Sequence, residues 1–465
     1  MPAAGTRGVE KPNKVADELR NLVPGRVVSD VKGYVRDWWP LLSISQEGGA
    51  SMLAVVKPQN VDEVAKVVRY AGSNGLRILS RGGGSSVTGA SVPHGEILID
   101  VTGLNQVLDV DENNRTATVQ AGVRLGDLEP RLAKLGFTVG QFPQSFEQAT
   151  VGGYISTMGT GHYSGKYGGV EDSVVRVQAV LPDGEVIWTR NRNTPRSSVG
   201  PDLSKLFIGA EGSFGVVTAA ELRLHRLPRH TWKAAYVFND FSTAVGSGRA
   251  LLDLDLKPAA CRIYSEVEAG IQFGTPKPVM LLVYSFSSAA VMEAVTREVT
   301  ETIGAEGVAG EPSVVDSWLE KRFALREEAE AVGKMGYLLD TAEMGSRWSA
   351  VLENYADVVT TLASIEGVSA VGAVVSHVYD QGACTDFSII LKPDVALYWD
   401  VWNALSQVAE RHDATLSHHH GTGILKAGLV RKEFPRSLLK LLKEGVDAKG
   451  TMSSHRASEG PHGAD

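Results

Sequence analysis

The sequence predicts an α+β protein with two α+β domains and a final helical segment. Apolar runs of strand length alternate with stretches of helical periodicity in both halves of the chain, while Gly-rich segments gather in the first half. A length of 465 residues allows two or three domains. Apolar types make up 43% and charged types 22%, which excludes collagen-like, wholly disordered and membrane-embedded classes.

The first domain is predicted over residues 1–227, including an N-terminal extension. Residues 52–58, 76–80 and 96–101 are apolar runs that predict strands, and a helical stripe predicts a helix over 60–75. Asn60 followed by Glu63 is typical of a helix start, and Gly75 of a helix end. Farther along we expect a strand (115–122), a short helix (126–136) and two strands around a turn at Asp183-Gly184 (174–187).

A second α+β domain is predicted over residues 228–396. Its expected strands are 234–240, 278–286, 367–379 and 386–393, and its expected helices include 287–304 and 347–367. Residues 397–465 are expected to be helical at first. They end in a polar tail from Ser453 whose composition predicts disorder.

Charge and cysteine content argue against several classes of protein, including nucleic-acid-binding and disulfide-rich proteins. Acidic residues outnumber basic ones by 54 to 46, giving a net charge of −8, which argues against binding nucleic acid. The two cysteines, Cys261 and Cys384, are too few for a disulfide framework or a cysteine-rich metal site. The first residues lack the apolar stretch of a secretion signal. We therefore expect a cytoplasmic protein.

A glycine-rich segment, RGGGSSVTG at 81–89, follows one predicted strand and precedes another. Consecutive glycines allow backbone N–H groups to surround a diphosphate, and the hydroxyls of Ser85, Ser86 and Thr88 add donors. It is neither a Walker loop nor a Rossmann fingerprint. Taken alone, it could also be a mobile loop.

Two further segments have the same character. Residues 143–145 with 150–161 and residues 209–218 are rich in Gly, Ser and Thr. Such segments have little apolar surface to bury and suit a backbone that wraps a polar ligand. Three of them in one domain favour a binding site over a set of turns.

These segments, in this order and spacing, resemble the FAD-binding domain of the vanillyl-alcohol oxidase or p-cresol methylhydroxylase superfamily. Within it, residues 194–202, 379–384 and 417–421 are most similar to the alkylglycerone-phosphate synthase (alkyldihydroxyacetonephosphate synthase) family. The resemblance covers most of the chain. It implies a two-subdomain FAD-binding domain, an α+β cap domain that binds substrate, and a C-terminal segment that returns to the flavin.

The resemblance also implies the residues around FAD. The pyrophosphate would lie on Arg81, Gly82, Gly83, Gly84, Ser85 and Ser86, with Thr88 nearby; the isoalloxazine and ribityl chain on Gln144, Ser145, Thr150, Gly152, Gly153, Thr157 and Thr160; and the adenine half near Glu211, Gly212, Gly215, Val216 and Val217. Some relatives attach FAD through a histidine in the glycine loop, where this chain has Gly and Ser, so we expect non-covalent FAD. Valine at Gly83 or Gly84 should abolish flavin binding by blocking the pyrophosphate.

Three adjacent histidines, His418, His419 and His420, are the main candidates for acid–base chemistry. Neighbouring side chains diverge, so not all three can face one site. A metal site is a competing interpretation, but beyond the triplet there is no second H-x-H and no HExxH, and we expect no metal. A surface accident is the other alternative. The resemblance implies that the histidines face flavin and substrate, with His420 as first choice.

Arginines are candidates for binding an anionic substrate, because a guanidinium forms a bidentate fork. Arg262 matches an active-site arginine of the resembled family, and Arg326 is a second candidate, although its surroundings also fit a charged helix face. Asp386 stands where that family has a catalytic tyrosine. It could act as a base, orient a histidine, or simply be exposed.

The leading hypothesis is an FAD-dependent oxidoreductase acting on a hydroxyl-bearing, anionic substrate such as a 2-hydroxy acid, with histidine removing the proton and hydride passing to flavin N5. The alternative is an alkylglycerone-phosphate synthase that forms an ether-lipid bond through a flavin N5 adduct without net redox change. A non-catalytic flavoprotein is the third. Partners considered are the small anionic substrate, a membrane surface contacted peripherally if the substrate is lipid-related, and a second copy in a homodimer.

Overall fold

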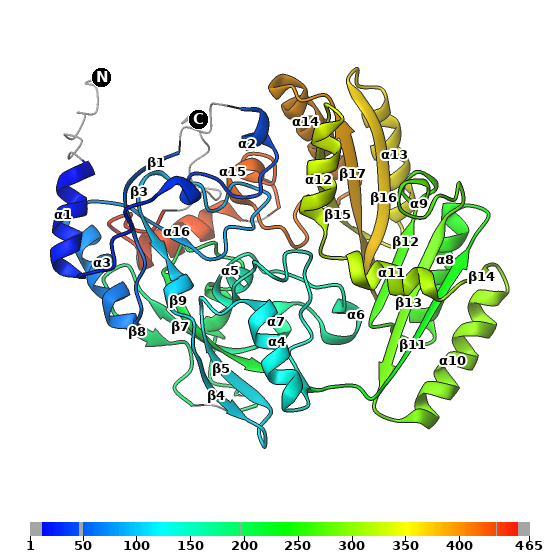
Figure 1. Ribbon diagram of the computed structural model, residues 1–465, viewed down its shortest axis with the longest axis horizontal. Helices are drawn as coiled ribbons and strands as arrows, with labels where there is room; N and C mark the ends of the chain where they lie inside the picture. The colour runs from blue at the N-terminus through cyan, green and yellow to red at the C-terminus, as the bar shows by residue number, and fades with distance from the viewer. Residues whose placement is uncertain (1–11, 46–49, 193, 196, 434, 454–465) are drawn as a thin grey trace.

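The computed structural model of the protein describes residues 12–45, 50–192, 194–195, 197–433 and 435–453. The N-terminal half contains two main sheets (Figure 1). The first is parallel, in the order β1 (Ser51–Val56), β3 (His94–Asp100), β2 (Ile78–Arg81). The second is antiparallel, in the order β4 (Val107–Asp111), β5 (Thr116–Gln120), β9 (Val216–Arg223), β7 (Val174–Val180), β8 (Val186–Trp188).

Short elements complete this half. They are the paired strands β6 (Phe137–Thr138) and β10 (His225–Arg226), the 3-10 helices η1 (Lys32–Tyr34), η2 (Val101–Gly103) and η3 (Leu203–Leu206), and the helices α1 (Pro12–Leu22), α2 (Leu41–Ile44), α3 (Val61–Asn74), α4 (Leu125–Lys134), α5 (Val151–Ser156), α6 (Ser164–Tyr167) and α7 (Val170–Ser173).

Local sequence signals account for several of these elements. The Asn60 side chain accepts a hydrogen bond from the backbone N–H of Glu63 and starts α3, and Gly75 ends it with a φ of 65°. The turn between β7 and β8 falls at Asp183-Gly184, as expected. The loop expected over 209–218 was too long, because β9 already begins at Val216 and is buried through Leu222.

The second half is built on one antiparallel sheet in the order β14-β11-β13-β12-β16-β17-β15. The strands are β11 (His230–Val237), β12 (Ala260–Tyr264), β13 (Val279–Phe286), β14 (Val308–Gly310), β15 (Leu338–Arg347), β16 (Val368–Tyr379) and β17 (Gly382–Leu391). The helices are α8 (Phe241–Asp253), α9 (Glu266–Phe273), α10 (Ala289–Gly304), α11 (Ser313–Lys321), α12 (Leu325–Lys334), α13 (Val351–Ala363) and α14 (Val395–Arg411).

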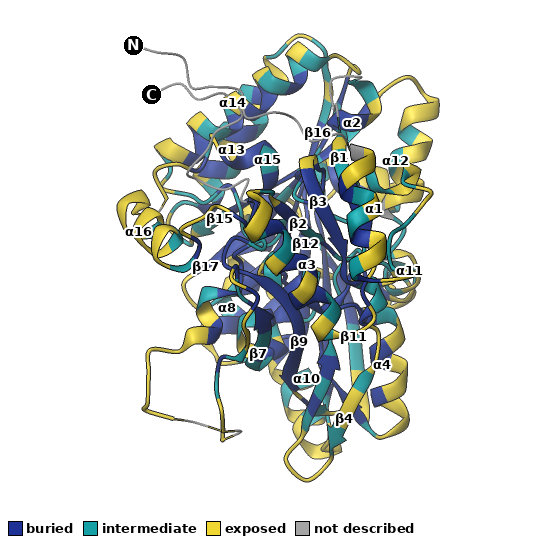
Figure 2. Ribbon diagram, turned by 90° about the vertical axis from the view of Figure 1, so that its left-hand side faces the viewer, coloured by how far each residue is buried: buried dark blue, intermediate teal, exposed yellow. Residues whose placement is uncertain are grey.

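Alternating residues of this sheet pack against different helices. Ile263 packs in a core with α8 and α10, whereas its neighbour Tyr264 packs in another with α9 and α11. The outer strands β15 to β17 share a third core with α13 and α14. Figure 2 shows the strands as largely buried and the outer faces of the helices as exposed.

The chain then returns to its first half through α15 (Gly423–Lys426) and α16 (Arg436–Val446) (Figure 1). Met452 belongs to the core of the first half and forms a β-bridge with Ile78 of β2. The mixed architecture with two α+β halves is therefore as expected. The boundaries at 227 and 396 stay predictions, and the tail from residue 454 lies outside the described residues.

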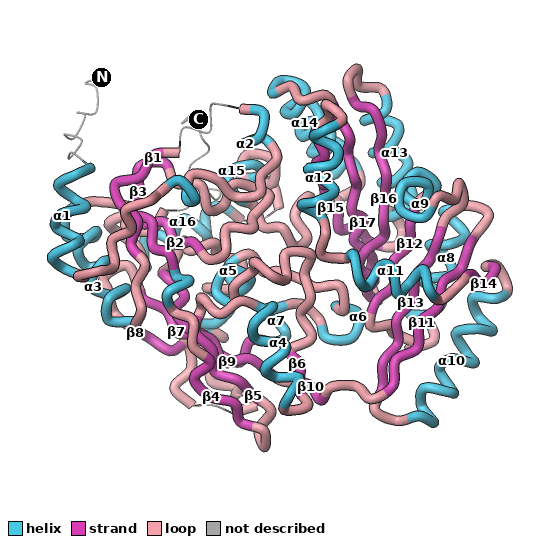
Figure 3. The backbone as a smooth tube through the Cα atoms, viewed as in Figure 1, coloured by secondary structure: helices cyan, strands magenta, loops and turns pink. Residues whose placement is uncertain are grey.

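Loops fill the space between the sheets of the two halves (Figure 3). Because these loops carry the Gly-rich segments and the histidines, the region between the sheets is where a site can form. Among the helices described here, none is both long and apolar enough to cross a membrane.

Candidate active site

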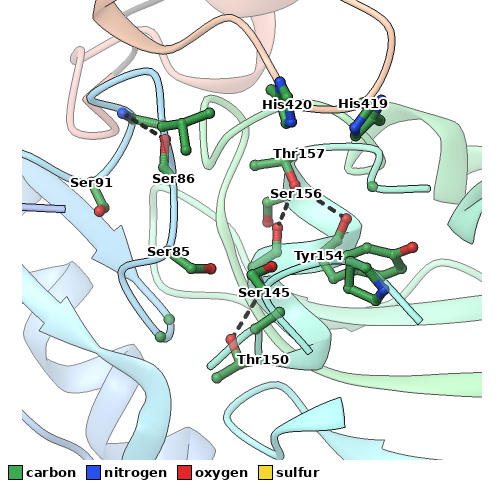
Figure 4. A pocket seen from close by; sticks show the side chains of 18 of the residues that line it. Ser85, Ser86, Ser91, Ser145, Thr150, Tyr154, Ser156, Thr157, His419 and His420 are labelled. Carbon is green, nitrogen blue, oxygen red and sulfur yellow. Dashed lines mark hydrogen bonds between the residues drawn. The ribbon is translucent and has the colours of Figure 1, made fainter. Parts of the chain in front are cut away.

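A pocket is lined by residues of the Gly-rich loops and of strands β12, β16 and β17 in the second half. Figure 4 shows His419 and His420 on one side of it, above Ser156, Thr157 and Tyr154, with Ser85 and Ser86 across from them. Most of the expected site residues line it: Arg81, Gly82, Gly83, Gly84, Ser85, Ser86, Gln144, Ser145, Thr150, Gly152, Gly153, Thr157, Thr160, Glu211, Val217, Arg262, Asp386, His419 and His420.

Six expected site residues do not line the pocket: Thr88, Gly212, Gly215, Val216, His418 and Arg326. Thr88 is buried behind the glycine loop, where its carbonyl accepts from the N–H groups of Ile424 and Leu425. Gly212 and Gly215 shape the turn before β9, with φ values of 79° and 153°. Thr88, Gly212 and Gly215 are therefore placed to support the pocket wall from behind.

The glycine loop presents unused backbone donors. Within the described part of the chain, the N–H groups of Gly83, Gly84 and Ser85 donate to no protein acceptor. The carbonyl of Gly83 faces the other way and accepts from Gln148 Nε2 at 2.6 Å. Successive unpaired N–H groups at a pocket wall suit an anionic ligand such as a diphosphate.

Contacts within the protein already require glycine at positions 83 and 84. A Cβ on Gly83 would lie 1.8 Å from the carbonyl oxygen of Gln148, and one on Gly84, whose φ is 71°, would lie 2.3 Å from the Arg81 guanidinium. A Cβ at either position would therefore clash with the protein itself, and the expected clash with a pyrophosphate stays a prediction. A side chain here would displace the loop that carries Thr150.

Arg81 lines the pocket, but its guanidinium donates hydrogen bonds to backbone carbonyls. It donates to the carbonyls of Gly33, Arg36 and Ser91 at 2.8–3.2 Å. Burial lowers its pKa, which Asp37 and Asp100 oppose. Its charge fastens the segment before β1 to the glycine loop, and the placement of Arg81 at the pyrophosphate stays a prediction.

Glu211 connects the third Gly-rich segment to the histidine segment. Its carboxylate accepts from the N–H of Thr422 at 2.7 Å and of Gly423 at 3.1 Å. A Cβ on Gly421 would lie 2.3 Å from its Oε1, which explains a glycine directly after the histidines. Glu211 therefore fixes the loop that follows His420, a role that the sequence did not indicate.

The histidines are organised around Glu343 of β15, a residue that sequence reasoning missed. Its carboxylate is fully buried and accepts from the backbone N–H groups of His419 (3.1 Å) and His420 (2.9 Å) and from Lys426 Nζ (2.9 Å). His419 Nδ1 lies 2.8 Å from Glu343 Oε2. In the sequence Glu343 is one of two acids, with Asp340, in a run of mostly small and apolar residues, and that signal is too weak to single it out.

The two pocket-lining histidines have opposite electrostatics. Burial lowers the pKa of His419, but the Glu343 carboxylate outweighs it and the net pKa is raised above 6.5. Burial lowers the pKa of His420 to about 3, although its Nδ1 lies 3.2 Å from Glu343 Oε2. That Nδ1 is not aligned for a hydrogen bond. His419 thus carries the basic imidazole, and His420 stays neutral.

Glu343 keeps its charge despite burial. Burial raises its pKa, but His419, His420 and Lys426 together hold the pKa well below the usual value. A carboxylate that orients one imidazole nitrogen leaves the other nitrogen as a proton acceptor of increased basicity. The pair Glu343 and His419 therefore has the composition of a general base and its orienting group.

Arg262 of β12 is a buried cation on the same side of the pocket as Asp386 and His419. It is buried, donates from Nε to Tyr264 Oη at 3.1 Å, and lies over the ring of Trp318. Burial lowers its pKa, but Tyr264 and Asp386 outweigh this and the net pKa is raised. None of the carboxylates in the described chain lies within 4 Å of its nitrogens. Arg262 can therefore accept an anionic ligand.

Arg326 does not line the pocket. It projects from α12 with 68% of its side chain exposed and pairs with Glu330 at 3.4 Å, as its charged-helix alternative predicted. Arg322, four residues earlier, packs against the same Trp318 as Arg262 and has a buried Nε without a partner. Arg322 is thus the arginine of this segment that approaches the pocket wall.

Asp386 of β17 is half-buried and lines the pocket beside Arg262 and His419. Burial raises its pKa, opposed by His419 and Arg262. Two further pocket residues were missed: His162, with an unpartnered Nδ1, and His377 of β16, whose Nδ1 lies 2.7 Å from Ser164 Oγ. A single histidine in a loop and another in a strand carry no pattern that singles them out.

Some histidine and acidic side chains near the pocket lie close enough together to surround a metal ion. One such set is His377, His418 and His419, and another is Glu343, His419 and His420. Around Glu343, however, an ammonium already occupies the position of a cation, since Lys426 Nζ lies 2.9 Å from the carboxylate. The cluster is therefore neutralised by its own residues.

Comparisons with known proteins agree with a flavin site. Residues 52–190 match a family model described as an FAD binding domain, and residues 227–455 match that of the FAD linked oxidases, C-terminal domain. Together the two matches span most of the chain.

Relatives of known sequence span nearly the same length. The alkyldihydroxyacetonephosphate synthase of Dictyostelium discoideum is 28% identical over 441 residues, covering 85% of this chain and 71% of that protein. An uncharacterized FAD-linked oxidoreductase, YgcU, of Escherichia coli O157:H7 is 28% identical over 432 residues, covering 86% and 88%.

Solved structures show the same fold. An alkyldihydroxyacetonephosphate synthase superposes with a TM-score of 0.81 at 22% identity, covering 98% of this chain and 87% of that one. A p-cresol methylhydroxylase with substrate bound superposes with a TM-score of 0.78 at 18% identity, covering 97% of each chain.

Proposed function

Because the chain belongs to the FAD-linked oxidases, with an FAD-binding domain followed by their C-terminal domain, we propose that it oxidises a small hydroxyl-bearing anion such as a 2-hydroxy acid. The observation that carries the proposal is the pairing, in one pocket, of a carboxylate-oriented imidazole with a buried guanidinium. The imidazole suits the hydroxyl proton, and the guanidinium suits the anionic group of the same molecule.

The residues of the pocket fit FAD as the cofactor. The free N–H groups of Gly83, Gly84 and Ser85 and the hydroxyls of Ser145 and Thr150 would hold its polar parts. When bound, FAD supplies an acceptor for the two electrons that leave the substrate carbon with its hydrogen. The glycine loop contains no histidine, which supports non-covalent binding. Flavin that stays with the acid-precipitated protein would contradict this.

His419, rather than the initially favoured His420, is the proposed base. A general base works best when its pKa is near the operating pH, and the pKa of His419 is raised whereas that of His420 is about 3. With Nδ1 held by Glu343, His419 can accept the hydroxyl proton at Nε2. His420, neutral and beside it, is suited to accept or donate one hydrogen bond that positions the substrate.

Arg262 is the proposed partner of the substrate's carboxylate or phosphate. It is buried, charged and lines the pocket together with Asp386 and His419. A charge-assisted hydrogen bond in such surroundings is stronger than a neutral one and selects anions over neutral alcohols. Asp386, next to Arg262, keeps the local charge balanced when no substrate is present.

Anaerobic titration of the purified flavoprotein with small 2-hydroxy acids tests the proposal. We expect the absorbance of the oxidised flavin to bleach as one electron pair is taken from each substrate molecule. Simple alcohols of the same size serve as controls and should bleach it far more slowly. A flavin that stays oxidised with every hydroxy acid would reject the proposal.

A second candidate function is ether-bond formation without net redox change, as in the synthases to which the chain is similar. Its support is the 28% identity over 441 residues with the Dictyostelium discoideum enzyme. Asp386, where that family's resemblance implies a tyrosine, speaks against it, because a carboxyl and a phenol differ by about six pKa units. Incorporation of labelled fatty alcohol into acylglycerone-phosphate, with no electron acceptor consumed, would favour this candidate.

A further inference from the structure

His162 lines the pocket but has no part in the proposed proton transfer. It lies in the loop between α5 and α6, where its backbone N–H donates to the carbonyl of Phe142 at 3.0 Å. Its ring packs edge-on against Trp318, with the ring centroids 5.5 Å apart. The guanidinium carbon of Arg262, which also lines the pocket, lies 5.6 Å from the centroid of the same indole. His162 and Arg262 are therefore neighbours on the pocket wall.

The two ring nitrogens of His162 differ in their surroundings. Within the described residues, neither nitrogen has a hydrogen-bond partner. Nδ1 is buried, whereas Nε2 is open to the pocket that the residue lines. The residue as a whole is only 5% exposed, so its ring is held by packing on its other sides. An unpaired polar atom at a pocket wall is one that a ligand can satisfy.

The imidazole of His162 is neutral. Burial lowers its pKa well below the ordinary value, and the charges of Arg262, Arg322 and His419 lower it further. A neutral imidazole carries one N–H, and a buried N–H without an acceptor is rarer in proteins than a buried acceptor without a donor. The proton therefore belongs on Nε2, where it faces the pocket. His162 is thus a donor, whereas His419, whose pKa is raised, is suited to accept a proton.

We propose that His162 donates a hydrogen bond from Nε2 to the anionic group of the substrate that Arg262 binds, and so helps to select anions. The inference rests on the proposed oxidation and adds a binding residue to it. An N–H and a guanidinium side by side offer donors and no acceptor, so they suit the oxygens of a carboxylate or phosphate. Because both groups pack against Trp318, they are in place before the substrate binds.

Titration of the oxidised flavoprotein with propionate, which lacks the 2-hydroxyl group, tests the inference. The shift of the flavin spectrum gives the dissociation constant. His162→Phe keeps an aromatic ring against Trp318 and removes both nitrogens. It should weaken propionate binding by about 10- to 100-fold, the range for a hydrogen bond to a charged group. Methyl phosphate, titrated in the same way, shows whether a phosphate depends on His162 as a carboxylate does. Propionamide, which is neutral, should be affected far less.

Matched variants separate hydrogen bonding from packing. His162→Gln lacks the ring but carries an amide N–H near the position of Nε2, and should recover most of the affinity. His225→Phe replaces a histidine that packs against Tyr167 and does not line the pocket, and should leave the dissociation constant unchanged. His162→Phe also removes the unpartnered Nδ1, so its free energy of unfolding, measured by chemical denaturation, should not fall below that of wild type.

Nitrogen NMR gives a readout that does not depend on affinity. In the resting protein the His162 ring should carry its proton on Nε2 and should not titrate between about pH 5 and pH 9, on either side of the ordinary histidine pKa. Addition of propionate should shift the Nε2 signal. A resting proton on Nδ1 would overturn the inference, because Nε2 could then only accept a hydrogen bond.

The remaining outcomes distinguish the inference from the proposed function. Flavin that no hydroxy acid bleaches, in a protein that binds propionate through His162, would reject the proposed oxidation and keep the anion site. Bleaching by a hydroxy acid together with an unchanged dissociation constant in His162→Phe would overturn only the assignment of His162. Wild-type protein that binds neither propionate nor methyl phosphate would overturn that assignment as well.

Discussion

The two sides of the pocket are built in different ways. The side formed by the Gly-rich loops uses backbone N–H groups and hydroxyls, held by close contacts such as that between Gly83 and Gln148. The opposite side uses charged side chains from separate strands, centred on Glu343 and Arg262. The first is shaped by the absence of side chains and the second by the balance of buried charges. The two should therefore respond differently to substitution.

The largest effect is expected on the charged side, from Glu343→Gln. This change leaves Lys426, which is only 1% exposed, as a buried ammonium without a countercharge. Breaking a buried pair by removing one partner costs about 3–5 kcal/mol. We expect the free energy of unfolding to fall by that amount, measured by chemical denaturation. Activity should fall as well, because His419 loses the carboxylate that raises its pKa.

A double variant tells these two consequences apart. Lys426→Met combined with Glu343→Gln removes both charges, and replacing a whole buried pair by uncharged groups is often close to neutral for stability. We expect stability to recover while activity does not. Recovery of both would show that Glu343 has no part in the chemistry and serves only to neutralise Lys426.

On the loop side, the largest effect is expected from Gly83→Val. Its Cβ would meet the Gln148 carbonyl at 1.8 Å, and overpacking of this kind costs about 1–3 kcal/mol or more. The loop at 145–150 must move, so the purified protein should contain little FAD, as measured by the ratio of flavin to protein absorbance. Gly33→Ala, where a Cβ meets nothing within 4 Å, is the control. Full flavin content in Gly83→Val would mean that the loops do not hold the cofactor.

The loop side could largely be predicted from the sequence. Backbone that wraps a polar ligand concentrates Gly, Ser and Thr in short runs, and these runs are visible without a structure. What could not be predicted is what each glycine touches, because Gln148 and Arg81 become neighbours only through the fold. The strand at Val216 was missed for a related reason: the glycines before it suggested a loop that continued too far.

The charged side could be predicted only in part. His419, Arg262 and Asp386 were found, but mainly through a family resemblance. Glu343 joins them because β15 pairs with β17 in a register that sets it opposite Asp386. Such pairing between distant strands is a property of the sheet, and no local pattern encodes it. Arg326, the candidate named from the sequence, is exposed, whereas Arg322, which the sequence did not single out, packs against Trp318, and only the fold distinguishes the two.

An arginine pair tests whether the charged side recognises anions. Arg262→Ala should weaken binding of a non-reactive carboxylate analogue by about 1.5–3 kcal/mol, the range for hydrogen bonds to charged groups. The shift of the oxidised flavin spectrum during titration measures the dissociation constant. Arg326→Ala, an exposed change, should alter it by less than about 0.5 kcal/mol. Equal effects of the two variants would contradict the placement of the anion at Arg262.

The smallest expected effect is on the pH dependence of stability and of kcat/KM. It compares the contribution of His419 with that of His420, both on the charged side. The pKa of folded His419 is raised above its unfolded value of about 6.5, so its pairing with Glu343 stabilises the fold fully below that pH and the contribution is lost as the pH rises through the folded pKa. Activity should follow the opposite course, because the base must be neutral: kcat/KM should rise with pH over the same window. One pKa unit corresponds to about 1.4 kcal/mol, so the stability change is modest.

His419→Asn should remove both trends, whereas His420→Asn should keep both, since the pKa of His420 is about 3 in the folded protein. Thermal unfolding and kcat/KM recorded between pH 5 and pH 9, about two units to either side of neutrality, measure the two trends. If the acid limb of kcat/KM disappears in His420→Asn and persists in His419→Asn, the base is His420 and the role inferred for Glu343 is wrong.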